Sequence, residues 1–243
     1  MLVREWMDAG AKSVDAGASM ALASRIMKEN KTSFLPVTRQ GCLVGVVTDR
    51  DVKRASASDV SLLDAHEQMY LVARIKVADI MSENPVTVSP TDTVEDTARI
   101  LLDHGISGAP VVDESGALRG VITQKEIFSG LVRLTGADIP GVRFGFLLDD
   151  RPGSIKEVTD SIRTHGGRMV SILSSRDQAP PGKRFAWVHM SGVDDRDLEG
   201  LLAELSARVR VLYMTAITAQ GRVFVENGKD MKPPPARPTA SGA

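Results

Sequence analysis

The chain has 243 residues, enough for two compact domains of ordinary size. Its 30 lysine and arginine residues nearly balance its 31 aspartate and glutamate residues, so charge alone favours neither nucleic acid nor an anionic membrane as a partner. No apolar run approaches the roughly 18 residues that a membrane span needs, and the first residues do not resemble a secretory signal. The lone Cys42 cannot form an internal disulfide. We therefore expect a cytoplasmic protein without membrane or nucleic-acid partners.

An internal repeat organises the first half of the chain. Residues 3–54 align with 77–130 after one inserted residue, and 45–51 falls on 120–126. The second copy predicts, in order, a strand at 85–88, a helix from Val94 to a stop at His104-Gly105, strands at 109–112 and 118–122, and a helix from near Thr123. Each copy is therefore β-α-β-β-α, and the two copies should pack face to face.

The domain boundaries follow from this repeat and from the composition beyond it. We assign 1–60 to the first motif, 61–76 to a connecting helix, 77–134 to the second motif, 138–220 to a second domain, and 227–243 to a disordered, proline-rich tail. The fold class is α+β.

The repeat resembles a known family. The Gly-hydrophobic-hydrophobic-Thr-x-x-Asp ending, the upstream Pro-Val strand and the opening Met helix are similar to the CBS motif, and a pair of such motifs is called a Bateman module. The resemblance covers residues 1 to about 132. It implies a regulatory ligand such as AMP, ATP or S-adenosylmethionine, with no cofactor required.

The end of each repeat carries the candidate ligand chemistry. Thr48 and Asp51 bracket a helix start, where a carboxylate can accept from two ribose hydroxyls and free backbone N–H groups attract phosphate. The alternative is that they only cap the helix. The family pattern implies that each site combines the ribose carboxylate of one motif with the adenine slot of the other. Site one would then consist of Thr48, Arg50, Asp51, Val86, Ile106, Ser107 and Pro110.

The corresponding second site departs from this pattern. It would consist of Lys12, Thr32, Ser33, Pro36, Thr123, Lys125 and Glu126. Glutamate replaces the ribose aspartate, and lysine enters the adenine slot. One added methylene moves a carboxylate by roughly 1.5 Å, enough to disturb a contact made at about 2.7 Å. We expect one competent nucleotide site and a second that is weak, empty or altered in specificity.

The second domain shows another order of elements. Strands are predicted at 142–148, 169–173, 185–190 and 209–214, with helices near 155–163 and 198–205, which gives the ferredoxin-like order β-α-β-β-α-β. With its Asp-Arg-Pro-Gly-Ser connection, this stretch resembles an ACT domain, a family that binds amino acids. The ligand loop would be Arg151, Pro152, Gly153 and Ser154, although a tight strand-to-helix turn needs a glycine in any case.

The two resemblances together define the functional hypotheses. A CBS pair followed by an ACT domain is similar to the acetoin-utilisation accessory protein family, which is associated with growth on acetoin or butanediol. The four histidines are scattered, and we find no catalytic or metal-binding set. We predict a non-enzymatic homodimer that senses an adenosine nucleotide and signals to an unknown regulated protein. The alternative is an amino-acid-responsive interaction protein that acts through the ACT domain.

Overall fold

A computed structural model describes residues 1–58, 75–218, 221–226 and 229–230. The chain forms two compact units, Met1–Gly130 and Leu131–Ala243. The predicted connecting helix at 61–76 lies outside the described residues except for its last two positions, and so does the predicted tail beyond residue 230.

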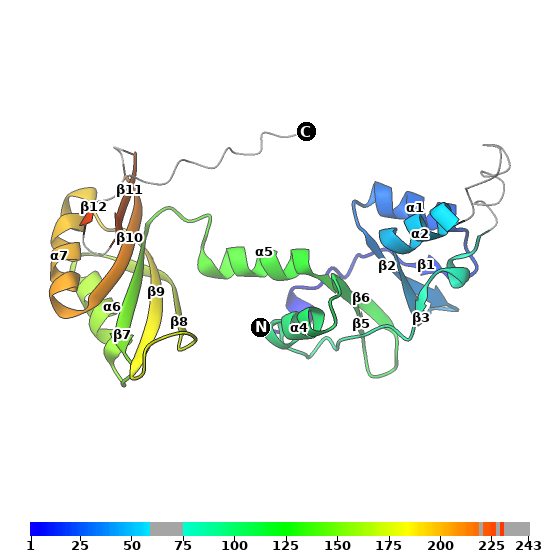
Figure 1. Cartoon of the computed structure of the whole chain (residues 1–243), viewed down its shortest axis with the longest axis horizontal. Helices are drawn as coiled ribbons and strands as arrows, with labels where there is room; N and C mark the ends of the chain where they lie inside the picture. Colours follow the sequence, from blue (N-terminus) through cyan, green and yellow to red (C-terminus); the bar gives the residue numbers. More distant parts are fainter. Residues whose placement is uncertain (59–74, 219–220, 227–228, 231–243) are drawn as a thin grey trace. The chain divides into compact units, whose positions relative to one another are not determined.

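The first repeat has the predicted order of elements. It comprises β1 (Val14–Asp15), α1 (Met20–Glu29), β2 (Phe34–Arg39), β3 (Cys42–Thr48) and α2 (Asp49–Ser58). The Ser19 hydroxyl starts α1 by accepting from the amide of Leu22 at 3.2 Å. In Figure 1, α1 and α2 lie side by side, and both contact the strands of this repeat.

The second repeat matches this order except in its first strand. It comprises α4 (Val94–Asp103), β5 (Gly108–Val112), β6 (Leu118–Thr123) and α5 (Gln124–Thr135). Gly105 ends α4 with φ of 62°, as its sequence position predicted. The strand predicted at 85–88 is wrong, because only Val88 pairs, in a single bridge to Val111. Pro85 has no N–H to donate, so it cannot extend a ladder.

Each repeat packs its leading segment into the other repeat. Val3, in the short helix η1 (Val3–Glu5), is fully buried in the core of the second repeat. Val77, in η2 (Val77–Asp79), is equally buried in the core of the first. The strand β4 (Ser82–Glu83) pairs with β3, and Asp8 bridges in the same way to Val121 of β6. The repeats are therefore interlocked rather than merely stacked.

The second unit is a sheet with two helices packed against it (Figure 1). Its elements are β7 (Val142–Asp149), α6 (Ser154–Thr164), β8 (Arg168–Ser175), β9 (Lys183–Ser191), η3 (Asp195–Asp197), α7 (Leu198–Arg208), β10 (Arg210–Thr218), β11 (Gly221–Glu226) and β12 (Lys229–Asp230). The strands lie antiparallel in the order β12-β11-β10-β7-β9-β8. The order β-α-β-β-α-β through β10 agrees with the prediction.

Two strands extend this sheet past the predicted end of the domain. β11 pairs with β10, and β12 pairs with β11 inside the stretch that we predicted to be disordered, so that prediction is wrong for Lys229 and Asp230. The sequence contains a signal for β11, because the run Val223-Phe224-Val225 combines β-branched and aromatic residues, which are enriched in strands. Hydrogen bonds between strands organise these residues although no helical apolar period is present.

The sheet of the second unit holds the end of α5. The carbonyl oxygen of Thr135 accepts from the hydroxyl of Ser171 and from Nδ1 of His189, each at 3.0 Å. Because a carbonyl can only accept, the proton of a neutral His189 ring lies on Nδ1. Its Nε2 is buried without a hydrogen-bond partner among the described groups.

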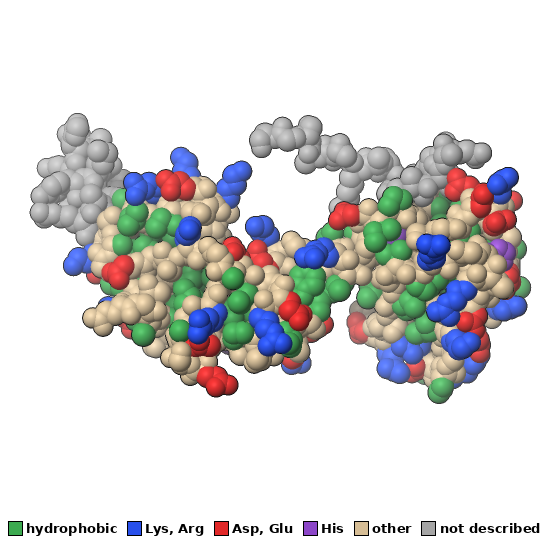
Figure 2. All heavy atoms as spheres, turned by 180° about the vertical axis from the view of Figure 1, so that it is seen from behind, with side chains coloured by type: hydrophobic (Ala, Val, Ile, Leu, Met, Phe, Trp, Pro, Cys, Tyr) green, Lys and Arg blue, Asp and Glu red, His purple; other side chains and the backbone are tan. Residues whose placement is uncertain are grey.

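The surface offers no single dominant charge on the face that Figure 2 shows, where Lys and Arg lie among Asp and Glu. Within the described ranges, no helix is both long enough and apolar enough to cross a bilayer.

Candidate functional site

The first candidate site is a cavity in the Met1–Gly130 unit. Its volume is about 500 Å³, and both repeats contribute to its lining. All seven residues predicted for site one line it: Thr48, Arg50, Asp51, Val86, Ile106, Ser107 and Pro110. The fold brings them together because β3 pairs with β4, the strand that precedes Val86. The end of β3 and the start of α2 therefore lie near Val86 and near the start of β5.

Asp51 lies in this cavity with its carboxylate fixed. The side chain is buried, at 8% exposure. Its Oδ2 accepts from the amide and the hydroxyl of Thr48 at 2.9 and 2.7 Å, and the Thr48 hydroxyl accepts in return from the Asp51 amide at 3.3 Å. These bonds form a capping box at the start of α2. The capping alternative is thus met in the structure, and the same side chain also lines the cavity.

Two cations lie near this carboxylate. Arg54 Nη2 donates to Asp51 Oδ1 at 2.9 Å, while Arg50 lines the cavity with an exposed side chain. At the same helix end, a hydrogen bond from Lys53 lowers the pKa of Asp49, so that carboxylate stays ionised. The site therefore combines a positioned acceptor with donors at the N-terminus of α2.

A second cavity of about 320 Å³ contains most of the predicted second site. Six of the seven residues line it: Lys12, Thr32, Ser33, Thr123, Lys125 and Glu126. Pro36 is not among its lining residues, because it lies buried within β2.

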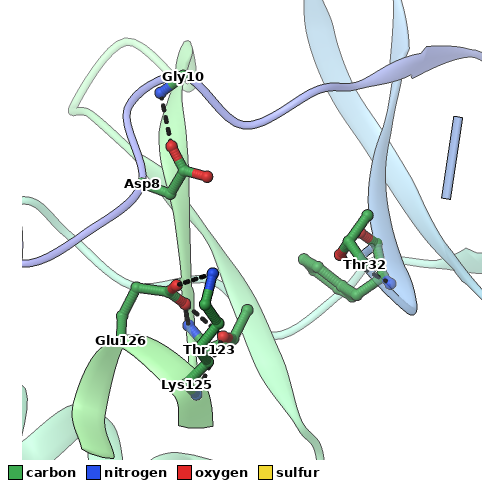
Figure 3. Close-up of polar contacts among 7 residues, drawn as sticks. Asp8, Gly10, Thr32, Thr123, Lys125 and Glu126 are labelled. Carbon is green, nitrogen blue, oxygen red and sulfur yellow. Dashed lines mark hydrogen bonds and ion pairs between the residues drawn. The ribbon is translucent and has the colours of Figure 1, made fainter. Parts of the chain in front are cut away.

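The second cavity repeats the capping geometry of the first. Oε2 of Glu126 accepts from the amide of Thr123 at 3.0 Å and also from its hydroxyl. Figure 3 shows these two residues and Lys125 together at the start of α5, with Thr32 on the opposite side and Asp8 bonded to Gly10. The extra methylene of Glu126 therefore does not remove the carboxylate from its threonine.

The walls of the two cavities differ more than their carboxylates do. Val86 and Ile106 of the first cavity correspond in the repeat to Lys12 and Thr32 of the second. The ionisable residues lining the first are two arginines and three carboxylates, Arg50, Arg54, Asp49, Asp51 and Glu83. Those lining the second are three lysines and two carboxylates, Lys12, Lys31, Lys125, Asp8 and Glu126. The balance of charge is thus reversed.

The two cavities share part of their walls. Ser33, Phe34 and Ser107 line both. The Ser33 carbonyl accepts from the amide of Asp49, and the Ser107 carbonyl accepts from the amide of Gln124, each at 3.0 Å. Each serine therefore holds the first residue of one of the two helices that carry the site carboxylates.

Sequence reasoning missed several lining residues. Phe34, Asn84, Pro85, Gly105 and Gly108 line the first cavity, and Asp8, Asn30 and Lys31 line the second. The repeat could have predicted two of them. Asp8 and Lys31, which line the second cavity, correspond in the repeat to Ser82 and Gly105, which line the first.

The predicted loop of the second unit joins β7 to α6. Gly153 caps α6 with φ of 88°, a conformation that favours glycine. Ser154 is 4% exposed, and its hydroxyl has no hydrogen-bond partner in the described part of the chain. Both ends of the Arg151 guanidinium donate to Glu157, at 2.7 and 2.8 Å, which lowers the pKa of Glu157. Arg151 is therefore bound to the helix that follows it, α6.

Comparison with known proteins identifies the repeats. Residues 3–58 and 77–133 each match the family model described as the CBS domain. A CBS domain-containing protein of Dictyostelium discoideum is 27% identical over 135 residues, which cover 55% of this chain and 93% of that protein. The inosine-5'-monophosphate dehydrogenase of Korarchaeum cryptofilum is 39% identical over 110 residues, covering 45% of this chain and 20% of the enzyme.

Two further matches also cover about half of this chain. The homoserine O-acetyltransferase of Methanococcoides burtonii is 33% identical over 116 residues, covering 47% of this chain and 21% of the enzyme. Among solved structures, CBSX2 in complex with AMP is 27% identical and covers 54% of this chain and 96% of that chain, with a TM-score of 0.46. The chain thus spans about a fifth of the length of the two enzymes.

Proposed function

We propose that the two repeats, which match the CBS domain model, sense an adenosine nucleotide in the cavity that contains Asp51. The observation that carries the proposal is that seven residues from both repeats, chosen by motif alone, line one cavity of about 500 Å³. That volume lies within the usual range for small-molecule sites.

The chemistry of the cavity fits the three parts of such a ligand. An ionised carboxylate offers about four lone-pair positions, so Asp51 can accept from a ribose hydroxyl beside its bonds to Thr48 and Arg54. Val86 and Ile106 offer apolar surface for a planar base. Arg50 and the N-terminus of α2 are suited to phosphate.

We propose a regulatory role without catalysis of its own. In the described part of the chain, no group of three or more His, Cys, Asp or Glu side chains is placed to hold a metal ion. A ligand regulates when it binds one conformation of the pair more tightly than another, and that difference can be passed to a partner protein. A role in acetoin metabolism, cytoplasmic location and action as a homodimer belong to the same proposal.

A ligand panel tests this function. The full chain is heated with AMP, ATP, S-adenosylmethionine or adenosine. Ligand that binds the folded state adds RT ln(1 + [L]/Kd) to the free energy of unfolding, about 2.7 kcal/mol at 100 times Kd, and so raises the melting temperature. We expect a saturable shift with at least one adenosine ligand, and none with ribose. If no adenosine compound shifts the transition, the nucleotide proposal is wrong.

A second candidate function rests on the loop before α6. We propose, as the alternative, that this unit is an ACT domain whose α6 N-terminus binds the carboxylate of an amino acid. The buried hydroxyl of Ser154 without a partner, next to Gly153, favours it. The same melting experiment with the twenty amino acids separates the two functions, because a shift with an amino acid and none with nucleotides supports only the second.

A further inference from the structure

We propose that the second cavity binds a small phosphorylated molecule that lacks a purine base, such as a sugar phosphate. The cavity is the one lined by Lys12, Lys31, Lys125, Thr32 and Glu126. This inference goes beyond the proposed function, which concerns the Asp51 cavity.

The walls of the second cavity are unsuited to a base. Where the first cavity presents Val86 and Ile106, the second presents the ammonium group of Lys12 and the hydroxyl of Thr32. The Thr32 hydroxyl already donates to the carbonyl of Phe34 at 3.0 Å and accepts from its amide at 3.3 Å. The face of a purine ring carries no hydrogen-bond acceptor, so a ring stacked on Lys12 would desolvate a charged group where the first cavity offers apolar surface, which is unfavourable.

The lysines are available for an anion. Neither Lys12 nor Lys31 makes an ion pair within the ranges that the structure describes, and Lys125 Nζ lies 3.8 Å from Glu126. The two carboxylates are engaged locally, since Asp8 accepts from the amide of Gly10 at 2.9 Å and Glu126 caps α5 (Figure 3). A phosphate would therefore meet ammonium groups and the N-terminus of a twelve-residue helix.

The remaining groups indicate what else the ligand carries. The Glu126 carboxylate, held by Thr123, keeps acceptor capacity for a sugar hydroxyl. The cavity, at about 320 Å³ against about 500 Å³ for the first, lies at the low end of the range for small-molecule sites. A ligand with a phosphate and hydroxyl groups but no base matches both the hydrogen-bonding groups and the volume of the second cavity.

Calorimetry with ribose 5-phosphate tests the inference on the full chain at constant ionic strength. The variant Asp51→Asn serves as the background, because it weakens binding at the first cavity and leaves the residues of the second cavity unchanged. We expect ribose 5-phosphate to bind in this background, ribose to give no heat, and Lys12→Val or Lys31→Ala to weaken binding by at least about tenfold. Absence of saturable binding, or equal binding with and without Lys12→Val, would overturn the inference.

The internal repeat supplies a converse test. The double substitution Lys12→Val and Thr32→Ile copies the wall of the first cavity into the second, so the number of AMP molecules bound per chain should rise from one to two. Two equivalent AMP sites in the unsubstituted chain would contradict the inference. A chain that binds ribose 5-phosphate through Lys12 but binds none of the adenosine ligands of the melting panel would support this inference while refuting the proposed nucleotide site.

Discussion

The carboxylate of Glu126 accepts hydrogen bonds from both the amide and the hydroxyl of Thr123. Asp51 makes the same two contacts with Thr48 at the other cavity. From sequence, two features predict a poorer second site: the longer side chain of Glu126 and the lysine at position 12. The structure leaves the difference in the walls, because the acceptor is present in both cavities while Val86 and Ile106 line only the first.

Asp51→Asn should weaken AMP binding by about 10-fold to 100-fold, because the hydrogen bonds of a charged acceptor contribute about 1.5–3 kcal/mol. Titration calorimetry measures this. The matched substitution Glu126→Gln should leave AMP affinity within about twofold. Because Asp51 also caps α2, urea unfolding of Asp51→Asn should show a loss of about 1 kcal/mol. If Glu126→Gln abolishes AMP binding and Asp51→Asn does not, the two cavities have been assigned the wrong way round.

Val3→Ala and Val77→Ala should each destabilise the repeat that the residue does not belong to in sequence. Both side chains are fully buried, so each substitution should cost about 2 kcal/mol. Hydrogen exchange should show lost protection mainly in β5 and β6 for Val3→Ala, and in β2 and β3 for Val77→Ala. The opposite pattern would contradict the exchange of leading segments.

Gly141→Ala should destabilise the second unit by about 1–3 kcal/mol. A Cβ at this position would lie 2.0 Å from the carbonyl oxygen of Met190, so a backbone strand must move. Gly200 in α7 is the matched control, since the nearest atom to an added Cβ lies 3.8 Å away and alanine is the better helix former. Thermal unfolding should therefore show a lower melting temperature for Gly141→Ala and a higher one for Gly200→Ala than for the parent chain. Equal melting temperatures would count against the close contact at Met190.

The second unit should lose stability in acid through its exposed ion pairs. Hydrogen bonds from Lys183 and Arg176 lower the pKa of Asp149 and of Asp150 in the folded chain. The stabilisation is complete above the ordinary carboxyl pKa of about 3.8 and is lost as pH falls through the lowered values. Unfolding of Arg176→Gln should depend less on pH below about 4. An unchanged acid slope would show that the Arg176 pair contributes nothing.

Two copies of the chain should associate through α5. Phe128, Leu131 and Val132 are exposed and share one face of this helix, at spacings of three and four residues. Light scattering after gel filtration should report a dimer, and Phe128→Asp with Leu131→Asp should give a monomer with unchanged circular dichroism. Arg133→Asp, a charge change on the same helix, is the control. A monomeric parent chain would refute the predicted homodimer.

Much of the fold follows from the repeat and from local rules. The helix stop at Gly105 was readable, because the left-handed conformation that ends a helix favours one residue type at one position. The reduction of the predicted strand at 85–88 to a single bridge at Val88 could not be predicted, since strand pairing depends on which N–H groups face a partner in the folded chain. The seven residues of the first cavity came from a motif, whereas Asp8 and Lys31 were missed because they reach the second cavity through the exchanged segments and a positive-φ turn.

The exchange of leading segments also affects the order in which the two cores can form as the chain is synthesised. The core of the first repeat is incomplete until Val77 has been synthesised, and Val3 has no core to enter until Ile122 has followed. At about 5–20 residues per second, the first segment waits roughly 6–24 s for its site. During that interval its apolar side chains are exposed to solvent and to chaperones. We therefore expect the two repeats to reach their native state as one cooperative unit, in spite of being two copies in the sequence.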